Sequence, residues 1–364
     1  MWLYRSQWYQ DVSEKSGFTF IDLFAGIGGI RLGFEEAGGR CLFSSEYDRF
    51  AQFTYQTFFG ERPDFSAVKE VNPPGDITKL RPDEVPNHDI LTAGFPCQPF
   101  SLAGVSKKQS LGRPHGFDDP TQGTLFFNVK EILHTKRPKA FLLENVKNLL
   151  SHDKGRTYRV IREELDAHYH VFARVIDAAG WVPQHRERIY ITGFRKKDFA
   201  EGQDWEINEF PELTDISPTE SGPTLDEILE PVVPDRYTLG PGTWQTLLRH
   251  RRHHRECGNG FGYGLIQAPF YGKITRTLSA RYHKDGAEVL IEQDSRRPRR
   301  LTPLECARLF GFPRRFQKYF ARNGYEQPVS DTQAYRQFGN SVVVPVVSAV
   351  AKTMAEKLRS AGAI

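Results

Sequence analysis

The sequence predicts an α/β fold, with a mostly parallel sheet covered by helices on both faces and a smaller, mixed second unit. Three observations support this prediction. Residues 18–46 follow the order strand, glycine turn, helix, strand and acid, which is typical of the opening of a nucleotide-binding fold. Short apolar runs at 88–93 and 141–146 indicate further buried strands. After Lys197 the chain becomes acidic and then basic, and α/β character returns near residue 329.

Composition narrows the class of protein. The 364 residues are enough for two domains, and 39% hydrophobic residues exclude wholesale disorder. The net charge of +4 is too small to indicate a polyanionic partner by itself, so that question depends on where the charges lie along the chain. Four cysteines without a CxxC pair argue against a metal site or a disulfide framework, and fit a reduced, cytoplasmic chain. No signal peptide or membrane span is evident, so no membrane role is expected.

The glycine turn at 25–29 is the first candidate binding element. Its glycines let the backbone approach a ligand closely, and Glu46, twenty residues after Gly26, is placed to accept from ribose hydroxyls. The turn does not match G-x-G-x-x-G, and similar turns serve ordinary strand–helix connections, so the signal is weak alone. Asp76 fits either an adenine amino group or the cap of a turn.

Two strand ends carry the candidate chemistry. Pro96 should end the strand at 88–93, which leaves Cys97 where α/β sheets bind ligands, and the next apolar run ends on Glu144. A lone cysteine is more often a small buried hydrophobe, and a carboxylate after a strand is often a helix cap. A thiolate can nevertheless add to C6 of cytosine and activate C5, while a carboxylic acid engages N3. Arg186 and Arg188 could steady charge at the ring oxygen, or simply pair with Glu187.

Polar and basic stretches complete the pattern. A loop of about twenty residues at 102–122 is unusual inside a compact domain and often acts as a lid. Dense basic runs occur at 249–255, 275–284 and 296–300, interleaved with aromatic residues and glycines. Such runs are either solvated surface or phosphate contacts.

Together these segments resemble the bacterial DNA (cytosine-5) methyltransferases. The matching segments, in the order of that family, are 24–29, 46–47, 75–77, 96–98, 144–146, 184–188, 299–309 and 337–341. Eight motifs in order leave little room for coincidence. The resemblance implies an S-adenosylmethionine (AdoMet)-dependent, Rossmann-like methyltransferase that releases S-adenosylhomocysteine, uses no metal and flips its target cytosine out of duplex DNA.

The resemblance also implies roles for individual residues. Cys97 matches the nucleophile, Glu144 the group at N3, Arg188 the residue facing the cytosine and Arg186 a phosphate contact. Positions expected at the AdoMet pocket are Phe24, Gly26, Gly28, Gly29, Glu46, Tyr47, Asp76, Ile77, Pro96, Leu125, Asn340 and Ser341. Candidate DNA contacts are Gln98, Ser101, Lys107, Lys108, Arg113, Arg276, Thr277, Arg281 and Lys284.

The expected organisation follows from the same resemblance. Residues 1–197 should form the catalytic AdoMet-binding domain, 198–328 the target-recognition domain and hinge, and 329–364 a segment returning to the catalytic domain. A monomer in the bacterial cytoplasm, bound to double-stranded DNA, is expected, with a restriction endonuclease as a functional rather than physical partner. Segments 105–113 and 275–288 look like the branch that modifies the inner cytosine of CC(A/T)GG.

Three alternatives stay open at this stage. A tRNA cytosine-5 methyltransferase would share the catalytic fold, although the basic unit after Phe194 favours duplex DNA. A nicotinamide dehydrogenase is compatible with the opening strand–turn–helix unit alone. A non-catalytic DNA-binding regulator would leave Cys97 and Glu144 without a reason to sit at strand ends.

Overall fold

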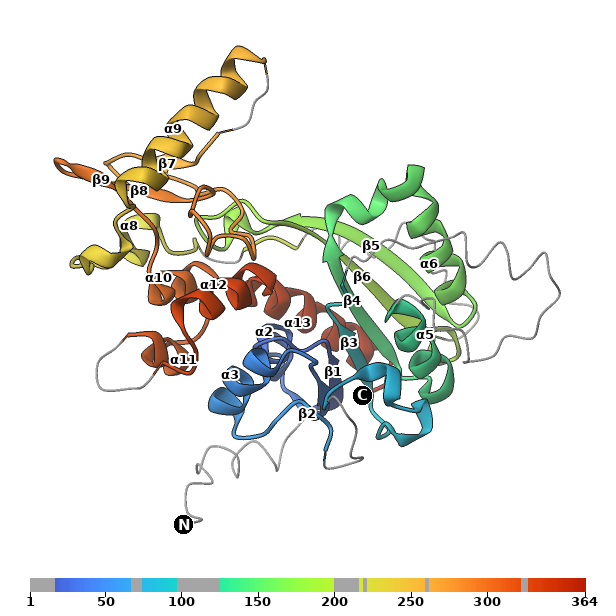
Figure 1. Cartoon of the computed structure of the whole chain (residues 1–364). Helices are drawn as coiled ribbons and strands as arrows, with labels where there is room; N and C mark the ends of the chain where they lie inside the picture. The colour runs from blue at the N-terminus through green and yellow to red at the C-terminus, as the bar shows by residue number, and fades with distance from the viewer. Residues whose placement is uncertain are drawn as a thin grey trace, which may run out of the picture.

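A six-stranded sheet organises the molecule (Figure 1). The computed structural model describes residues 17–66, 74–96, 125–199, 216–218, 221–258, 262–321 and 327–364. The strand order is β2-β1-β3-β4-β6-β5, with bounds β1 Phe18–Leu23, β2 Gly39–Ser45, β3 Ile90–Ala93, β4 Ala140–Val146, β5 Tyr169–Asp177 and β6 Glu187–Arg195. Strands β2, β1, β3 and β4 pair in parallel, whereas β6 lies antiparallel between β4 and β5. The predicted mostly parallel sheet is therefore confirmed.

Alternation along the strands divides the core between the two faces of the sheet. In β1, Phe18 and Phe20 join one apolar cluster, whereas Ile21 and Leu23 join the other. Helices α2 (Gly29–Glu36) and α13 (Val344–Ser360) supply the first cluster, and α5 (Leu125–Lys136) and α6 (Arg156–Asp166) supply the second. Strands covered on both faces read as nearly continuous apolar runs, which is why the sequence revealed them.

Strand β4 runs further than expected. The apolar run predicted an end at Glu144, yet β4 continues to Val146, because Asn145 and Val146 pair with Ile189 and Arg188 of β6. This pairing could not be predicted from the sequence, because β6 begins about forty residues after β4 ends and runs antiparallel to it.

The C-terminal segments complete the first core. Helices α10 (Pro303–Leu309), α11 (Arg314–Gln317) and α12 (Asp331–Asn340) pack into the same apolar cluster as α2 and α13. Among the described residues, the stretch Asp331–Ser360 has the length and hydropathy of a membrane span, but 67% of its most apolar window is buried within the fold. That burial is typical of core helices.

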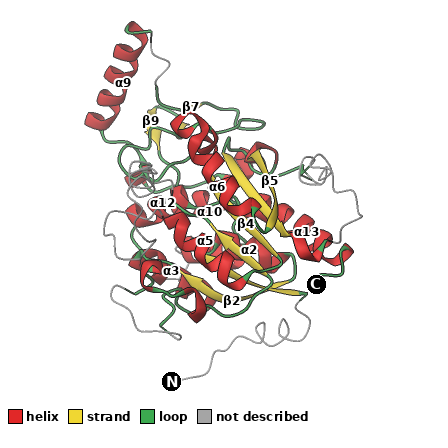
Figure 2. Ribbon diagram, turned by 90° about the vertical axis from the view of Figure 1, so that its right-hand side faces the viewer, coloured by secondary structure: helices red, strands yellow, loops and turns green. Residues whose placement is uncertain are grey.

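A second lobe lies beside the sheet. It contains α8 (Leu225–Ile228), β7 (Leu265–Ile266), β8 (Leu290–Gln293), β9 (Arg296–Arg299) and α9 (Pro241–Glu256), which extends away from the body in two perpendicular views (Figures 1 and 2). Helix α3 (Arg49–Phe59) flanks β2 at the opposite end of the molecule. Short 3-10 turns connect the elements at Ile77–Lys79, Pro82–Glu84, Lys147–Leu150, His152–Gly155, Ala178–Gly180, Lys196–Asp198, Asp235–Tyr237 and Lys318–Phe320. The division at residues 197 and 328 stays a prediction.

Candidate active site

The glycine turn follows β1 and bends through left-handed backbone. Phe24, Gly26 and Gly28 have φ values of 57°, 55° and 84°. Gly28 precedes the first turn of α2, and its N–H donates to the carbonyl of Ala25 at 2.8 Å. A bulky residue such as Phe24 in this conformation is strained, and strain of this kind concentrates at ligand-binding sites.

Close approach explains Gly29. A Cβ there would lie 2.9 Å from Cγ2 of Val342 and 3.0 Å from Oγ of Ser341. The turn after β1 thus touches the segment after α12, and two predicted pocket residues more than three hundred positions apart are neighbours. At Gly26 a Cβ would meet none of the described residues within 4 Å, so this part of the structure leaves open space in front of the turn. Small residues bordering open space fit a cradle for a nucleoside cofactor.

Glu46 lies at the end of β2 and reaches the same turn. Its carboxylate accepts from the N–H of Gly26 at 2.8 Å and from the N–H of Asp48 at 2.7 Å. Burial raises the pKa of Glu46, although these two backbone donors act in the opposite direction. The next residue, Tyr47, is 62% exposed, which leaves its ring available for stacking.

Gln52, which sequence analysis missed, joins Glu46 to the segment that precedes Asp76. Its amide donates to the carbonyl of Glu46 at 2.6 Å and to that of Pro74 at 3.1 Å. Asp76 lies two residues after Pro74 and caps a short turn by accepting from the N–H of Thr78 at 3.0 Å, with Ile77 buried beside it. The turn cap was one of the two roles expected for Asp76.

Glu144 and Arg188 form the centre of the candidate active site. Nε of Arg188 lies 3.2 Å from Oε1 of Glu144, and each side chain is mostly buried. Glu144 lies opposite Tyr190 in the β4–β6 register, so Arg188 is its diagonal neighbour on the same face. The Glu187 carboxylate pairs instead with Lys147, and Arg188 donates to the backbone carbonyl of Glu187 at 2.8 Å.

Burial governs the ionisation of Glu144. Removal from water raises its pKa, and the nearby Arg188 and Arg186 guanidinium groups lower it by less. A carboxyl group with a raised pKa keeps a proton closer to neutral pH than an exposed glutamic acid does. Glu144 can therefore donate a proton as well as accept a hydrogen bond.

The segment that leads to Cys97 passes directly beside Glu144. A Cβ on Gly94 would lie 3.6 Å from Oε2 of Glu144, and Asn145 donates from Nδ2 to the carbonyl of Phe95 at 2.8 Å. Cys97 itself lies outside the described residues, as do Gln98, Ser101, Lys107, Lys108 and Arg113. Asn145 was quoted within a motif but given no role by sequence reasoning. Its geometry makes it a clamp on the chain two residues before the cysteine.

Arg186 occupies a different environment from Arg188. It is 2% exposed, and its guanidinium donates to the carbonyls of Leu278 at 2.9 Å, Gly339 at 2.9 Å and Ser341 at 2.5 Å. It also lies 4.9 Å from the ring centre of Phe310. The guanidinium is directed into the protein rather than towards a surface that could meet a phosphate. It joins β6 to the second lobe and to the C-terminal segment.

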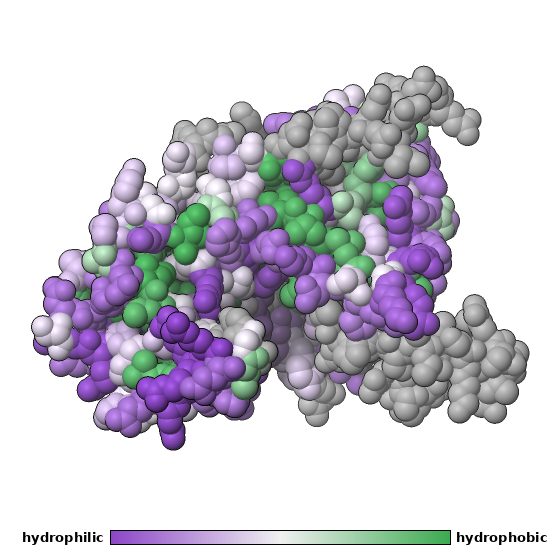
Figure 3. All heavy atoms as spheres, turned by 90° about the horizontal axis from the view of Figure 1, so that it is seen from above, coloured by the Kyte–Doolittle hydropathy of each residue, from purple (hydrophilic) through white to green (hydrophobic). Residues whose placement is uncertain are grey.

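The expected DNA contacts in 276–284 lie on the second lobe. Arg276, Arg281 and Lys284 are exposed, whereas Thr277 donates to the carbonyl of His185 at 2.6 Å. The buried side chain of Gln184 accepts from the N–H of Leu278 at 2.9 Å. These bonds attach the segment to the residues directly before β6, where Arg186 lies. From above, the surface is hollowed between this lobe and the part that carries the sheet (Figure 3).

The three remaining residues expected at the pocket lie at or just beyond the ends of elements. Leu125 begins α5 and packs against the second cluster, Pro96 is exposed three residues after the end of β3, and Asn340 is exposed at the end of α12. Nothing in the described part of the chain groups three or more histidine, cysteine, aspartate or glutamate side chains as a metal site would.

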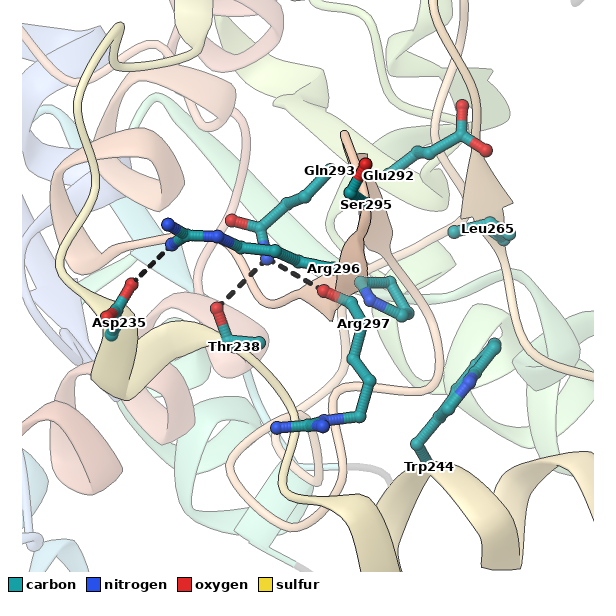
Figure 4. Close-up of a pocket in the computed structure, with 10 residues that line it drawn as sticks. Asp235, Thr238, Trp244, Leu265, Glu292, Gln293, Ser295, Arg296 and Arg297 are labelled. Atoms are coloured by element: carbon teal, nitrogen blue, oxygen red, sulfur yellow. Dashed lines mark hydrogen bonds and ion pairs between the residues drawn. The ribbon is translucent and has the colours of Figure 1, made fainter.

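One cavity, of about 720 Å³, lies away from this site, in the second lobe (Figure 4). It is lined by Asp235, Thr238, Trp244, Leu265, Glu292, Gln293, Ser295, Arg296, Arg297 and Pro298. Several of its polar groups already bond one another. Gln293 donates to Thr238 at 2.9 Å and to the carbonyl of Arg297 at 2.7 Å, and Arg296 pairs with Asp235 at 2.7 Å. These bonds join β8 and β9 to the segment of Asp235 and Thr238 that precedes α9.

Comparison with known proteins agrees with this geometry. The family model described as C-5 cytosine-specific DNA methylase matches residues 18–356. The DNA-cytosine methyltransferase of Escherichia coli strain K12 is 46% identical over 95% of this chain and 79% of its own length. The type II methyltransferase M.NlaX of Neisseria lactamica is 48% identical over 93% and 96% respectively. The crystal structure of the S. pombe Dnmt2 methyltransferase matches with a TM-score of 0.66 at 18% identity, over 94% of this chain and 99% of that one, which supports the fold.

Proposed function

The chain belongs to the C-5 cytosine-specific DNA methylase family, and we propose that it methylates C5 of a flipped cytosine through a covalent bond between Cys97 and C6. Methylation of DNA cytosine is the activity of the family, and relatives named for DNA do not favour the tRNA alternative. The observation that carries the mechanism is the Glu144–Arg188 pair beside the segment that leads to Cys97.

The proposed roles follow the needs of an electron-poor ring. The Cys97 thiolate adds to C6, while protonated Glu144 donates to N3 and takes up the charge that the addition releases. Arg188 holds the Glu144 carboxyl and faces the ring oxygen. AdoMet, when bound, supplies the electrophilic methyl group that C5 takes and leaves as S-adenosylhomocysteine. A base then removes the C5 proton, the C5–C6 double bond re-forms with that electron pair, the thiolate leaves, and the Glu144 carboxylate takes its proton back from N3.

The residues around the glycine turn fit AdoMet. We infer that the open space at Gly26 receives the methionine part, that Glu46 binds the ribose hydroxyls and that Asp76 binds the adenine amino group. Exposed Tyr47 is placed to stack on the adenine. The remaining lining is proposed to come from Phe24, Gly28, Gly29, Ile77, Pro96, Leu125, Asn340 and Ser341.

Covalent trapping tests the mechanism. A duplex with 5-fluorocytosine at the target should become attached to the protein in the presence of AdoMet, because the fluorine blocks the final proton abstraction. Cys97→Ser should abolish both the adduct and methyl transfer while AdoMet binding persists. Cys257→Ser is the matched control, since this cysteine is exposed at the end of α9. Turnover by the Cys97→Ser variant would overturn the mechanism.

Cofactor and nucleic-acid choice are tested separately. AdoMet should raise the melting temperature of the protein and NAD should not, because only a ligand of the folded state stabilises it. Methyl incorporation should occur with duplex DNA and not with tRNA. A melting shift with NAD alone would favour the dehydrogenase alternative.

We also infer a cytoplasmic, monomeric enzyme that acts on a CC(A/T)GG or related CC…GG site, with a restriction endonuclease as a functional partner. Segments 105–113 and 275–288 support the target, although the first lies outside the described residues. Sequencing of methylated cytosines in a random duplex library identifies the site directly. Methylation confined to an unrelated motif would overturn this assignment without affecting the reaction.

A further inference from the structure

Helix α9 concentrates positive charge that the candidate active site does not use. Its C-terminal part contains Arg249, His250, Arg251, Arg252, His253, His254 and Arg255. Four arginines against one acid, Glu256, give the helix a net charge of +3 with histidines neutral, whereas the whole chain carries +4. A charge that nearly equals that of the whole protein is therefore gathered on sixteen residues.

The arginines of α9 have no carboxylate partner within the described ranges. Arg251 donates to the hydroxyl of Tyr263 at 2.8 Å and lies 4.8 Å from the centre of that ring, and Arg249 donates to Thr246 at 3.2 Å. All four arginines are exposed. Solvated helix faces usually mix acids and bases at i, i+4 spacing, because like charges there repel. A one-signed helix is stabilised when a polyanion lies against it.

The N-terminal half of α9 packs against the second lobe, so the direction of its charged C-terminal end is defined. Leu247 packs with Leu239 and Leu290, and the ring of Trp244 lies 4.9 Å from that of Tyr263. Trp244 also lines the cavity shown in Figure 4, so that cavity lies beside the N-terminal half of α9. Beyond Leu247 no residue of α9 is fully buried, so the last turns project into solvent.

The charged end of α9 points in a direction in which it could contact a DNA duplex that extends beyond the active site. In Figure 1, α9 rises on the side of the molecule towards which the carboxyl end of β4 points, next to the hollow seen in Figure 3. We propose that α9 is an arm that contacts phosphates of the duplex beyond the methylated site. This inference rests on the proposed function only in taking duplex DNA as the substrate.

Salt dependence gives the sharpest readout of phosphate contacts. Each contact adds about 0.9 to the slope of log affinity against log salt, so three arginines account for about 2.7. Between 50 and 200 mM salt this slope corresponds to about a 40-fold loss of affinity.

The test variant combines Arg249→Gln, Arg252→Gln and Arg255→Gln, since glutamine preserves helix propensity. The matched control removes three other exposed arginines, by Arg40→Gln, Arg62→Gln and Arg314→Gln, on β2, after α3 and on α11. These elements lie at the opposite end of the molecule from α9 (Figure 1). A third protein, with lysine at the three α9 positions, keeps the charge and should keep the slope.

Binding and steady-state methylation are measured on a long duplex and on one trimmed to the target and its immediate flanks. On the long duplex the glutamine variant should lose about 2.7 from the salt slope and show a raised KM, whereas the control and lysine proteins should match wild type. On the trimmed duplex the glutamine variant should differ little from wild type. The proposal for α9 would be wrong if the glutamine variant kept the wild-type salt slope on the long duplex, or if its slope fell equally on both duplexes. Absence of methyl transfer by wild type on either duplex would count against the proposed function instead.

Discussion

Glu144 shows how one buried carboxyl can serve two purposes. It is only 9% exposed, so burial raises its pKa, yet Arg188 at 3.2 Å keeps it oriented. Because its pKa is raised, the acid is the member of the pair that can supply the proton for N3. The pair thus separates orientation from proton transfer.

Glu144→Gln should therefore lower kcat by about 10²- to 10⁴-fold, because the amide can hydrogen-bond N3 but cannot protonate it. Since its pKa is raised in the folded protein, wild-type kcat should fall as pH rises through that pKa, and this limb should be missing in the variant. Single-turnover methylation across pH measures both effects. An unchanged pH profile in the variant would assign the limb to another group.

Asp22 is a second buried acid, beneath the glycine turn in β1. One carboxylate oxygen accepts from Oγ1 of Thr92 at 2.9 Å, and the other has no hydrogen-bond partner in the described part of the chain. Burial raises the pKa of Asp22 to about 7, despite the opposing influence of Thr92 and Arg31. In the unfolded chain its pKa is about 4.

Because the folded state holds this proton more tightly, the contribution of Asp22 to stability is complete below pH about 4 and is lost as the pH rises to about 7. Asp22→Asn stays neutral throughout. The free energy of unfolding of wild type relative to the variant should fall by about 4 kcal/mol over that range. Denaturant melts of both proteins at several pH values measure the difference. A difference that stays constant with pH would show that Asp22 titrates alike in both states.

At the scale of elements, the crossing of α2 and α13 holds the glycine turn in place. A Cβ on Gly33 would lie 2.6 Å from Cγ1 of Val347 and 2.8 Å from the backbone nitrogen of Ser348. The two helices therefore touch through backbone at this point, and α2 carries the turn that precedes it. The contact explains how a C-terminal helix supports a site built by the first forty residues.

Gly33→Ala should cost about 1–3 kcal/mol and weaken AdoMet binding, because α2 has to move away from α13. Gly242→Ala is the control, since a Cβ at this position in the first turn of α9 meets none of the described residues within 4 Å. That variant should be neutral or slightly stabilising. Thermal melts with and without AdoMet measure both. Equal melting temperatures for the two variants would refute the tight crossing.

Elements with local signatures could be predicted from the sequence, and contacts between distant segments could not. The strands at 90–93 and 140–146 follow from apolar residues buried on both faces, and the turn after β1 follows from its glycines. The burial of Arg186 does not, because a charged residue in a basic motif resembles a surface contact. Its partners lie 92, 153 and 155 residues further along the chain. The direction of α9 is likewise set by tertiary packing alone.

At the scale of the whole molecule, buried ionic groups join the two lobes. Arg186 connects β6 to Leu278 and Gly339, and Arg299 at the end of β9 makes a two-point pair with buried Glu305 of α10, at 2.8 Å for each contact. Broken pairs of this kind leave uncompensated polar groups, which makes each joint costly to loosen. The lobes are therefore held in a fixed relation at the hollow where DNA is proposed to lie.

Two lysine variants distinguish the contact of Arg186 between the lobes from the proposed catalytic role of Arg188. Arg186→Lys should lower the melting temperature and raise KM for DNA, since one ammonium group cannot reproduce the planar fork that reaches three carbonyls. Arg188→Lys should lower kcat with less effect on the melting temperature. Melting curves and steady-state kinetics of both proteins give the comparison. A loss of kcat alone in Arg186→Lys would place that residue at the substrate.

Because β4 pairs with β6 along its whole length, the position of Arg188 relative to Glu144 depends on the number of residues between β5 and β6. Because side chains alternate across a strand, deleting one residue between Asp177 and Arg188 and letting β6 slide would turn Arg188 to the other side of the sheet from Glu144. Adding or removing one residue in the connection between β5 and β6 would therefore separate Arg188 from Glu144. Natural variation in chain length should accumulate elsewhere, and grafting of foreign recognition segments should succeed only at joints beyond β6.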